Sequence, residues 1–132
     1  MNIFVFFFIF LGSGLGGIAR FLLSYYSSEY LIGKYGWSQF DYGTIIVNLT
    51  GSFVTGFLSE FVIYFLPPHL RFFLLIGFLG GFTTFSTYNY SLMRYFLEAE
   101  YSKFLIFLFI HTIGGILFTL LGYKLGIIAQ KG

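Results

Sequence analysis

The sequence predicts an all-α protein, an integral membrane four-helix bundle that forms a single transmembrane domain over residues 1–132. Two observations support this fold class. Hydrophobic residues make up 58% of the chain and charged residues only 9%, although about a quarter of the residues in a soluble domain are charged. In addition, four apolar stretches reach the length of about 20 residues that a helix needs to cross a bilayer. Such a chain needs no charged surface in lipid.

The four stretches follow one another with short polar connections between them. We expect helices over residues 3–26, 43–66, 70–97 and 104–128. The first is interpreted as a retained span, because a signal peptide would have a basic start and a polar domain after its cleavage site. Pro67 and Pro68 end the second, since proline cannot continue a helix interior. The short connections leave no room for a soluble domain.

Small residues recur four positions apart in three of the stretches. The pairs are Gly12 with Gly16, Ser52 with Gly56, and Gly122 with Gly126. Small residues at this spacing let two helix backbones approach closely in a membrane. We therefore interpret the three pairs as packing faces.

The third stretch differs from the others in its middle. It carries Gly77, Gly80 and Gly81, followed by Thr83, Thr84, Ser86, Thr87 and Asn89. Glycine disfavours a helix interior, and non-helical backbone inside a membrane must be buried in protein or line a wet cavity. Two interpretations stay open at this point. The helix is either broken to build an ion or substrate site, or continuous with its hydroxyls bonded back to its own backbone.

Four further polar side chains inside the predicted spans bear on function, because such groups usually face protein or water. Arg20 either extends to the membrane surface or attracts anions into an aqueous vestibule. Asn48 either bonds a neighbouring helix or offers its amide protons to an anion. Glu60 lies toward the other side of the membrane from Arg20, and His111 is in the middle of the fourth stretch.

Composition excludes several classes of function. The chain has no cysteine, and His69 and His111 are far apart, so disulfides, thiolate chemistry and metal sites of typical spacing are not expected. No cluster of Lys and Arg indicates a nucleic-acid partner. An enzyme is not expected either, because no nucleophile, base and orienting group stand in a readable relation.

Basic residues are balanced between the two ends of the predicted bundle. If four helices alternate, Arg71, Lys124 and Lys131 share one side, and Lys34, Arg94 and Lys103 share the other. Lys and Arg near helix ends normally set the orientation of a membrane protein. The balance favours insertion in both orientations and an antiparallel dimer, unless another signal sets one topology.

Three segments together resemble the CrcB/Fluc family of fluoride channels. They read GGIARF at 16–21, GTIIVNLTGSF at 43–53 and GFLGGFTTFST at 77–87. The second and third are highly specific, and the resemblance covers essentially the whole chain. It implies a multi-pass protein of the inner or plasma membrane that lets cytoplasmic fluoride leave passively and so relieves fluoride toxicity.

The resemblance also implies an architecture and a bound ion. Members of the family are antiparallel, dual-topology homodimers of four-helix subunits with a broken third helix. Two fluoride pathways run along the dimer interface. A structural sodium ion (Na+) lies at the dimer centre, where the main-chain carbonyls of Gly80 and Thr83 are its expected ligands. Backbone oxygens suit such a cation.

Individual positions match the pore of the family. Asn48 matches the pore asparagine, and Phe85 matches the first phenylalanine of an aromatic box whose ring edges carry partial positive charge. The hydroxyl-rich stretch supplies Thr84, Ser86 and Thr87. His111 lies where some relatives have a pore-side residue, and Arg20 matches the vestibule arginine.

Two positions depart from the family pattern. Tyr88 stands where the family has the second phenylalanine, and Ser91 stands where it often has glutamate. The extra hydroxyl of Tyr88 would either donate to fluoride or obstruct a narrow path. The departures leave open that the chain is one subunit of a heterodimeric fluoride channel.

Two further hypotheses compete with a fluoride channel. A small proton-coupled, dual-topology exporter usually needs a carboxylate near the middle of the membrane, and Glu60 is off centre. Its transport would depend on a pH gradient. The other hypothesis is an accessory subunit with no transport of its own.

Overall fold

The computed structural model describes residues 3–131 and is helical over almost all of them; the side chains of Glu60, Ile63 and Tyr64 lie outside that description. The first helix, α1, spans Ile3–Tyr35. It ends where Gly36 adopts a left-handed conformation (φ 77°) and donates its N–H to the Ile32 carbonyl at 2.9 Å. Glycine adopts this conformation without steric cost, which makes it the usual helix terminator.

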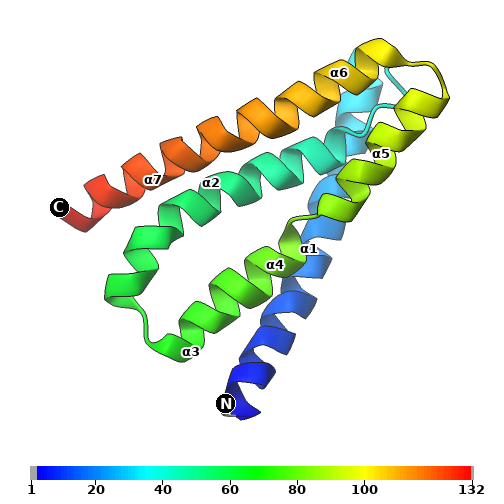
Figure 1. Cartoon of the computed structure of the whole chain (residues 1–132). Helices are drawn as coiled ribbons and strands as arrows, with labels where there is room; N and C mark the ends of the chain where they lie inside the picture. Colours follow the sequence, from blue (N-terminus) through cyan, green and yellow to red (C-terminus); the bar gives the residue numbers. More distant parts are fainter. Residues whose placement is uncertain (1–2, 132) are drawn as a thin grey trace.

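Helix α2 spans Tyr42–Phe65. It runs back along the molecule, roughly antiparallel to α1 (Figure 1). Asp41 caps its start by accepting the Thr44 N–H at 3.0 Å. Pro67 and Pro68 follow its end, and Pro68 opens the short helix α3, Pro68–Arg71. A proline is tolerated there because the first N–H groups of a helix have no partner within it.

The third predicted span consists of several pieces. Helix α3 continues directly into the π-helix η1, Phe72–Phe78, and then into α4, Leu79–Phe82. Thr83 and Thr84 are extended, and helix α5 resumes over Phe85–Leu97. Figure 1 shows the chain stepping sideways between α4 and α5.

The last span is one continuous helical rod. It comprises α6, Tyr101–Phe109, the π-helix η2, Ile110–Gly114, and α7, Gly115–Lys131. Short π-helical stretches inside a longer helix often occur at functional sites. His111 lies in η2.

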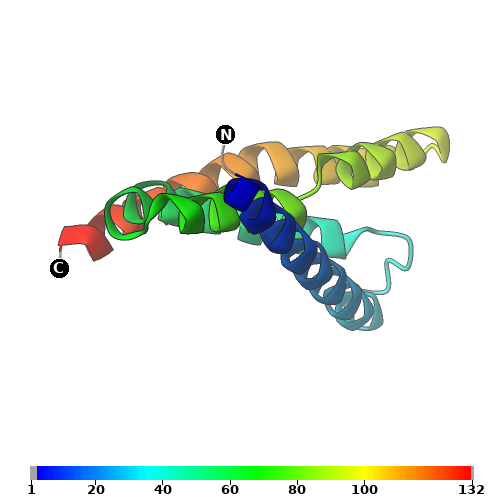
Figure 2. The same cartoon turned by 90° about the horizontal axis from the view of Figure 1, so that it is seen from below.

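The four spans alternate in direction. The α1–α2 and α5–α6 connections gather at one end of the molecule, and both chain ends lie toward the other (Figure 1). Figure 2 shows the C-terminal half of α1 diverging from α5 and α6. We use the name loop end for the end that holds the two connections.

Glycines make the closest helix contacts, as the small-residue pairs predicted. A Cβ atom on Gly56 would overlap the Thr119 carbonyl of α7, and one on Gly122 would overlap the Phe53 carbonyl of α2. On the other side, Gly12 faces the backbone of η1 around Phe73. The glycines therefore let α7 lie against α2, and α1 against the segment before the break.

The outward surface is strongly apolar. Three helical stretches are long and apolar enough to cross a membrane, at Ile3–Tyr35, Pro68–Leu97 and Tyr101–Lys131, and their most apolar windows are only 6% to 22% buried. Apolar side chains that point outward need lipid or another protein subunit around them. This is a multi-pass membrane protein, as its composition predicted.

The predicted helix ends need one clear correction. The first helix was expected to end at residue 26, but α1 continues to Tyr35. The apolar stretch ends before Ser27, Ser28 and Glu29, yet a helix can continue beyond the bilayer because its backbone is hydrogen-bonded internally. Arg20 therefore lies near the middle of α1.

Candidate functional site

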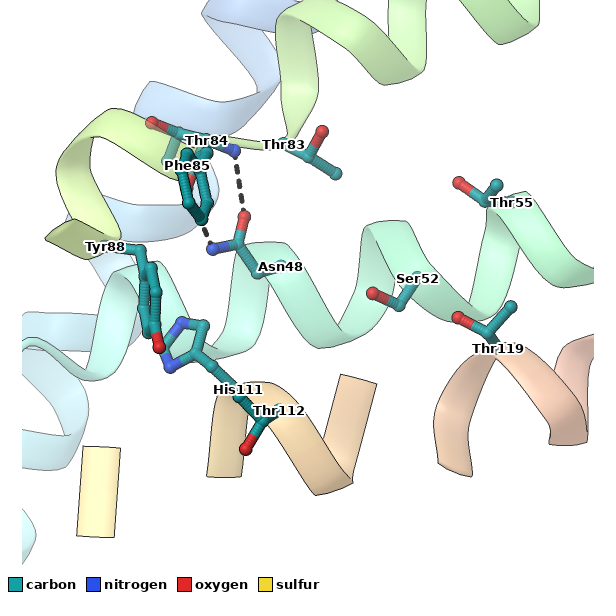
Figure 3. A pocket seen from close by; sticks show the side chains of 10 residues that line it. All are labelled: Asn48, Ser52, Thr55, Thr83, Thr84, Phe85, Tyr88, His111, Thr112 and Thr119. Atoms are coloured by element: carbon teal, nitrogen blue, oxygen red, sulfur yellow. Dashed lines mark hydrogen bonds between the residues drawn. The ribbon is translucent and has the colours of Figure 1, made fainter. Parts of the chain in front are cut away.

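The break between α4 and α5 is held by a side chain of α2. Asn48 donates its Nδ2 to the Thr84 carbonyl at 3.0 Å and accepts the Thr84 N–H on Oδ1 at 2.9 Å (Figure 3). Thr84 is the N-cap of α5 and has an extended backbone (φ −146°, ψ 116°), so its N–H has no partner within a helix, although its carbonyl can still accept from the first turn of α5. One amide thus satisfies both backbone groups of the residue at the break.

A cavity of about 450 Å³ opens beside this pair of bonds. Its walls come from α2, the break, α5 and the rod of η2 and α7 (Figure 3). The residues that line it are Asn48, Ser52, Thr55, Thr83, Thr84, Phe85, Tyr88, His111, Thr112 and Thr119. Six of the predicted site residues therefore meet here: Asn48, Thr83, Thr84, Phe85, Tyr88 and His111.

Three rings form the loop-end wall of the cavity. Phe85 and Tyr88 are three residues apart on α5, and their ring centroids are 5.8 Å apart. Tyr88 lies 4.6 Å from the His111 ring, whose Nδ1 is 2.9 Å from the Phe107 carbonyl. A carbonyl only accepts, so Nδ1 carries the proton in this bond. Phe85 itself is 75% exposed and is free to contact an ion or a second subunit.

Hydroxyl groups line the rest of the cavity, and four of them were not among the site residues predicted from the sequence. Thr55, Thr112 and Thr119 each donate to a carbonyl of their own helix, so their oxygens present lone pairs to the cavity. The Ser52 hydroxyl makes no hydrogen bond in the part of the chain that the structure describes, so its proton is available to a ligand in the cavity. The spacing of Asn48, Ser52 and Thr55 could have predicted two of these hydroxyls, because the three residues lie on one face of a helix.

Two predicted hydroxyls lie outside this cavity. Ser86 is exposed and stands 3.3 Å from the Thr84 hydroxyl. Thr87 lines a second cavity, of about 510 Å³, between α1, α2 and α5. Arg20 lines the same second cavity, and Thr84 borders both. The predicted site thus divides over two adjoining spaces that share Thr84.

The break also changes the bonding of two carbonyl groups. In a continuous helix, the Gly80 carbonyl would accept from the Thr84 N–H, and the Thr83 carbonyl from the Thr87 N–H. Here Thr84 donates to Asn48 instead, and Thr87 donates to the Thr84 hydroxyl at 3.2 Å. Both carbonyls therefore lose their usual helical partners. Oxygen atoms of this kind fit a hard cation such as Na+.

Fold and site together define a class of protein: a small, multi-pass helical membrane protein with polar cavities at an interrupted helix. Its sequence matches the family described as CrcB-like protein, Camphor Resistance (CrcB), over residues 7–123. The chain belongs to this family.

Relatives in three bacteria align over almost the whole chain. The protein is 43% identical to the "Fluoride-specific ion channel FluC" of Aquifex aeolicus over 88% of this chain and 91% of that one. It is 38% identical to "Fluoride-specific ion channel FluC 2" of Lactobacillus johnsonii, over 88% and 94% of the two chains. Identity to "Fluoride-specific ion channel FluC 1" of Staphylococcus aureus is 36%, over 90% and 93%.

Proposed function

We propose that this protein is a fluoride-selective ion channel, not an enzyme, that lets fluoride leave the cytoplasm passively and so relieves fluoride toxicity. Membership of the family and the names of the aligned relatives support this function. The observation that carries it in the structure is the Asn48 amide, held against Thr84 at the wall of a hydroxyl-lined cavity.

The chemistry of the cavity suits a small, strongly hydrated anion. A pore must replace the water of fluoride with hydrogen-bond donors at short range. Asn48 has a second amide proton beyond the one given to Thr84, and Ser52 has a free hydroxyl proton. The edges of Phe85 and Tyr88 carry partial positive charge, so these rings favour an anion without holding it tightly.

The pathway is proposed to include the neighbouring residues of the same face. Thr84, Ser86 and Thr87 form a connected set of hydroxyls, in which Thr84 Oγ1 donates to Thr87 Oγ1 at 3.0 Å. Arg20, in the adjoining cavity, would raise the local concentration of anions. His111 supports the ring of Tyr88 from the fourth span.

The working unit is proposed to be an antiparallel, dual-topology homodimer. The exposed Phe85 and the apolar outer faces of the helices are consistent with a second subunit beside the break. Basic residues are balanced between the two ends of the chain, which favours both orientations.

A structural Na+ is proposed to bind between the Gly80 and Thr83 carbonyls of the two subunits. When bound, it would supply positive charge that holds the two helix breaks together. We expect sodium, but not potassium at equal ionic strength, to raise the thermal unfolding midpoint of the purified dimer. Identical midpoints in the two salts would contradict this site.

Fluoride efflux from liposomes tests the main proposal. The protein is reconstituted alone into potassium-loaded vesicles, and efflux is recorded after valinomycin is added, with chloride in a parallel run. We expect fast fluoride efflux, no chloride efflux, and loss of fluoride efflux in Phe85→Ile. Absence of fluoride efflux from folded protein would contradict a homodimeric channel. Recovery in Tyr88→Phe would then indicate obstruction by the Tyr88 hydroxyl, whereas no recovery would favour a heterodimer with a second subunit.

A further inference from the structure

One face of α5 extends the polar surface from the break to the loop end. Thr84, Thr87, Ser91 and Arg94 follow one another at intervals of three, four and three residues, which places them on one side of a helix. The cavities follow the same order. Thr84 borders the first and second, and Thr87 borders the second and a third of about 300 Å³.

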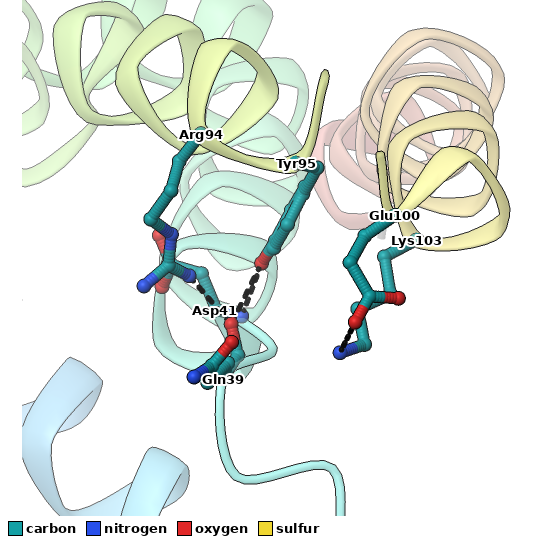
Figure 4. A network of polar contacts seen from close by, with 6 residues as sticks. All are labelled: Gln39, Asp41, Arg94, Tyr95, Glu100 and Lys103. Atoms are coloured by element: carbon teal, nitrogen blue, oxygen red, sulfur yellow. Dashed lines mark hydrogen bonds and ion pairs between the residues drawn. The ribbon is translucent and has the colours of Figure 1, made fainter. Parts of the chain in front are cut away.

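The third cavity lies between α5 and the α1–α2 connection. Its lining includes Thr87, Ser91 and Arg94 from α5, and Ser38, Gln39 and Asp41 from the connection. Figure 4 shows the Arg94 side chain lying over Gln39 and Asp41 at this end of the molecule. The cavity is therefore the outermost of the three adjoining polar spaces.

Arg94 is held in place without an ion pair. Its Nη2 donates to the Gln39 carbonyl, and its guanidinium carbon lies 5.3 Å from the centre of the Tyr95 ring. Its Nε is buried and has no hydrogen-bond partner. Among the side chains that the structure describes, no carboxylate forms an ion pair with Arg94. The nearby ion pair joins Lys103 Nζ and Glu100 Oε1 at 3.1 Å.

Asp41 lines the same cavity and carries a negative charge, but each of its oxygens is bonded to a group other than Arg94. Oδ1 accepts the Thr44 N–H at 3.0 Å, and Oδ2 accepts the Ser91 hydroxyl at 2.7 Å. The carboxylate also sits at the N-terminus of α2, where the helix dipole offsets negative charge. Ser91 is thus a positioning residue that keeps this carboxylate engaged.

Thr87 provides a free donor to the same cavity. Its hydroxyl oxygen accepts from Thr84 at 3.0 Å, and its own proton has no acceptor among the residues described. A hydroxyl proton and a guanidinium that forms no ion pair, on one helix face, are groups that a small anion prefers.

We propose that Thr87 and Arg94 form an outer anion subsite, at which fluoride binds between the loop end of the channel and the cavity beside Asn48. The inference rests on the proposed channel function and extends the pathway to the membrane surface. Arg94 concentrates fluoride there by its charge, so its effect is largest at low ionic strength, where charges are least screened.

The first arm of the test measures fluoride efflux as a function of ionic strength. We expect Arg94→Gln to lower efflux on the order of tenfold at low ionic strength, the lower end of what charge steering achieves, and to lower it much less at high salt. Arg94→Lys should retain most of the activity. Lys34→Gln is the matched control, because it removes one positive charge from the same end but does not line the cavity.

The second arm measures binding without transport. Trp37 is the only tryptophan of the chain, and its ring lies 5.3 Å from Phe40, which lines the subsite. Fluoride, but not chloride, should change Trp37 fluorescence in a saturable way. Arg94→Gln should shift the half-saturating fluoride concentration upward on the order of tenfold, by loss of the same charge effect, and Lys34→Gln should not.

The two arms separate the possible failures. Unchanged efflux in Arg94→Gln at low salt, together with an unchanged fluorescence titration, would overturn the subsite while the channel function stands. Wild-type protein that shows the fluorescence titration but no efflux would overturn the channel function while the subsite stands. A loss in Arg94→Gln that Lys34→Gln reproduces equally would show a general charge effect and overturn the subsite.

Discussion

At the scale of single residues, Asn48 has two roles: it stabilises the break between α4 and α5, and it lines the cavity proposed to bind fluoride. The extended backbone of Thr84 leaves its N–H without a helical partner, and an unsatisfied backbone group costs several kcal/mol in lipid. Asn48 bonds both the N–H and the carbonyl of Thr84. Asparagine suits this position because its side chain has an acceptor and two donor protons on one planar group.

Asn48→Ala removes both bonds to Thr84. We expect the free energy of unfolding to fall by about 1–3 kcal/mol, since the Thr84 N–H is left buried without a partner and such a group costs about that much, and we expect fluoride efflux to be lost. Unfolding in detergent, followed by circular dichroism, measures the first effect. The control is Asn89→Ala, because Asn89 is exposed on α5 and its side chain makes no hydrogen bond within the described residues. Equal destabilisation by the two variants would contradict the role of Asn48.

Tyr88 belongs both to the aromatic core and to the wall of the cavity. Its ring packs on Phe107 at 5.7 Å and on His111 at 4.6 Å, and it belongs to the aromatic cluster with Phe40 and Tyr95. The departure from phenylalanine therefore affects a residue that is part of the core as well as part of the cavity wall.

At the scale of helices, contact between backbones defines the arrangement. α2 and α7 touch where Gly56 meets Thr119 and where Gly122 meets Phe53. Because lipid supplies little hydrophobic drive between helices, close packing through small residues holds them together. The spacing of glycines in the sequence predicted these faces correctly.

Gly56→Ala tests this contact. The added Cβ would overlap the Thr119 carbonyl, so α2 and α7 must separate, and we expect a loss of about 1–3 kcal/mol, as for other overpacked sites. Thermal unfolding in detergent is the measurement. Gly33→Ala serves as the control, since a Cβ at Gly33 meets nothing within 4 Å and alanine favours a helix by about 0.5–1 kcal/mol. A Gly56→Ala midpoint at or above that of the wild type would contradict the packing role.

The connections between helices were predicted less well than the helices themselves. The structure continues α1 to Tyr35 because a helix bonds its own backbone and does not have to stop where the membrane ends. Its stop signal was Gly36, whose left-handed conformation is a property of the turn and not of hydropathy. Apolar content measures immersion in lipid, so it locates spans better than helix ends.

At the scale of the whole molecule, charge is the feature that bears on topology. Lys34, Arg94 and Lys103 belong to the loop-end termini of α1, α5 and α6, whereas Arg71, Lys124 and Lys131 belong to α3 and α7. Neither end therefore has an excess of the basic residues that direct insertion.

Dual topology is testable because the chain has no cysteine. Single cysteines are introduced as Gln130→Cys, near the chain end, and Ser102→Cys, at the loop end. A membrane-impermeant maleimide should label about half of each variant in intact cells and all of each after lysis, if orientation follows the charge balance. Complete labelling of one variant and none of the other in intact cells would show a single topology.

The sequence by itself determined the class of protein, its spans and most of the residues around the break. This information comes from apolar content, glycine spacing and three short segments. These features involve residues close together in the chain, so they can be read from the sequence directly. The tertiary structure alone decided which polar groups meet. Asn48 and Thr84 are 36 positions apart, and Asp41 and Ser91 are 50 apart. Such bonds depend on the rotation and depth of one helix against another, which local periodicity does not specify. For the same reason, the unpaired charge of Arg94 became visible only in the folded chain.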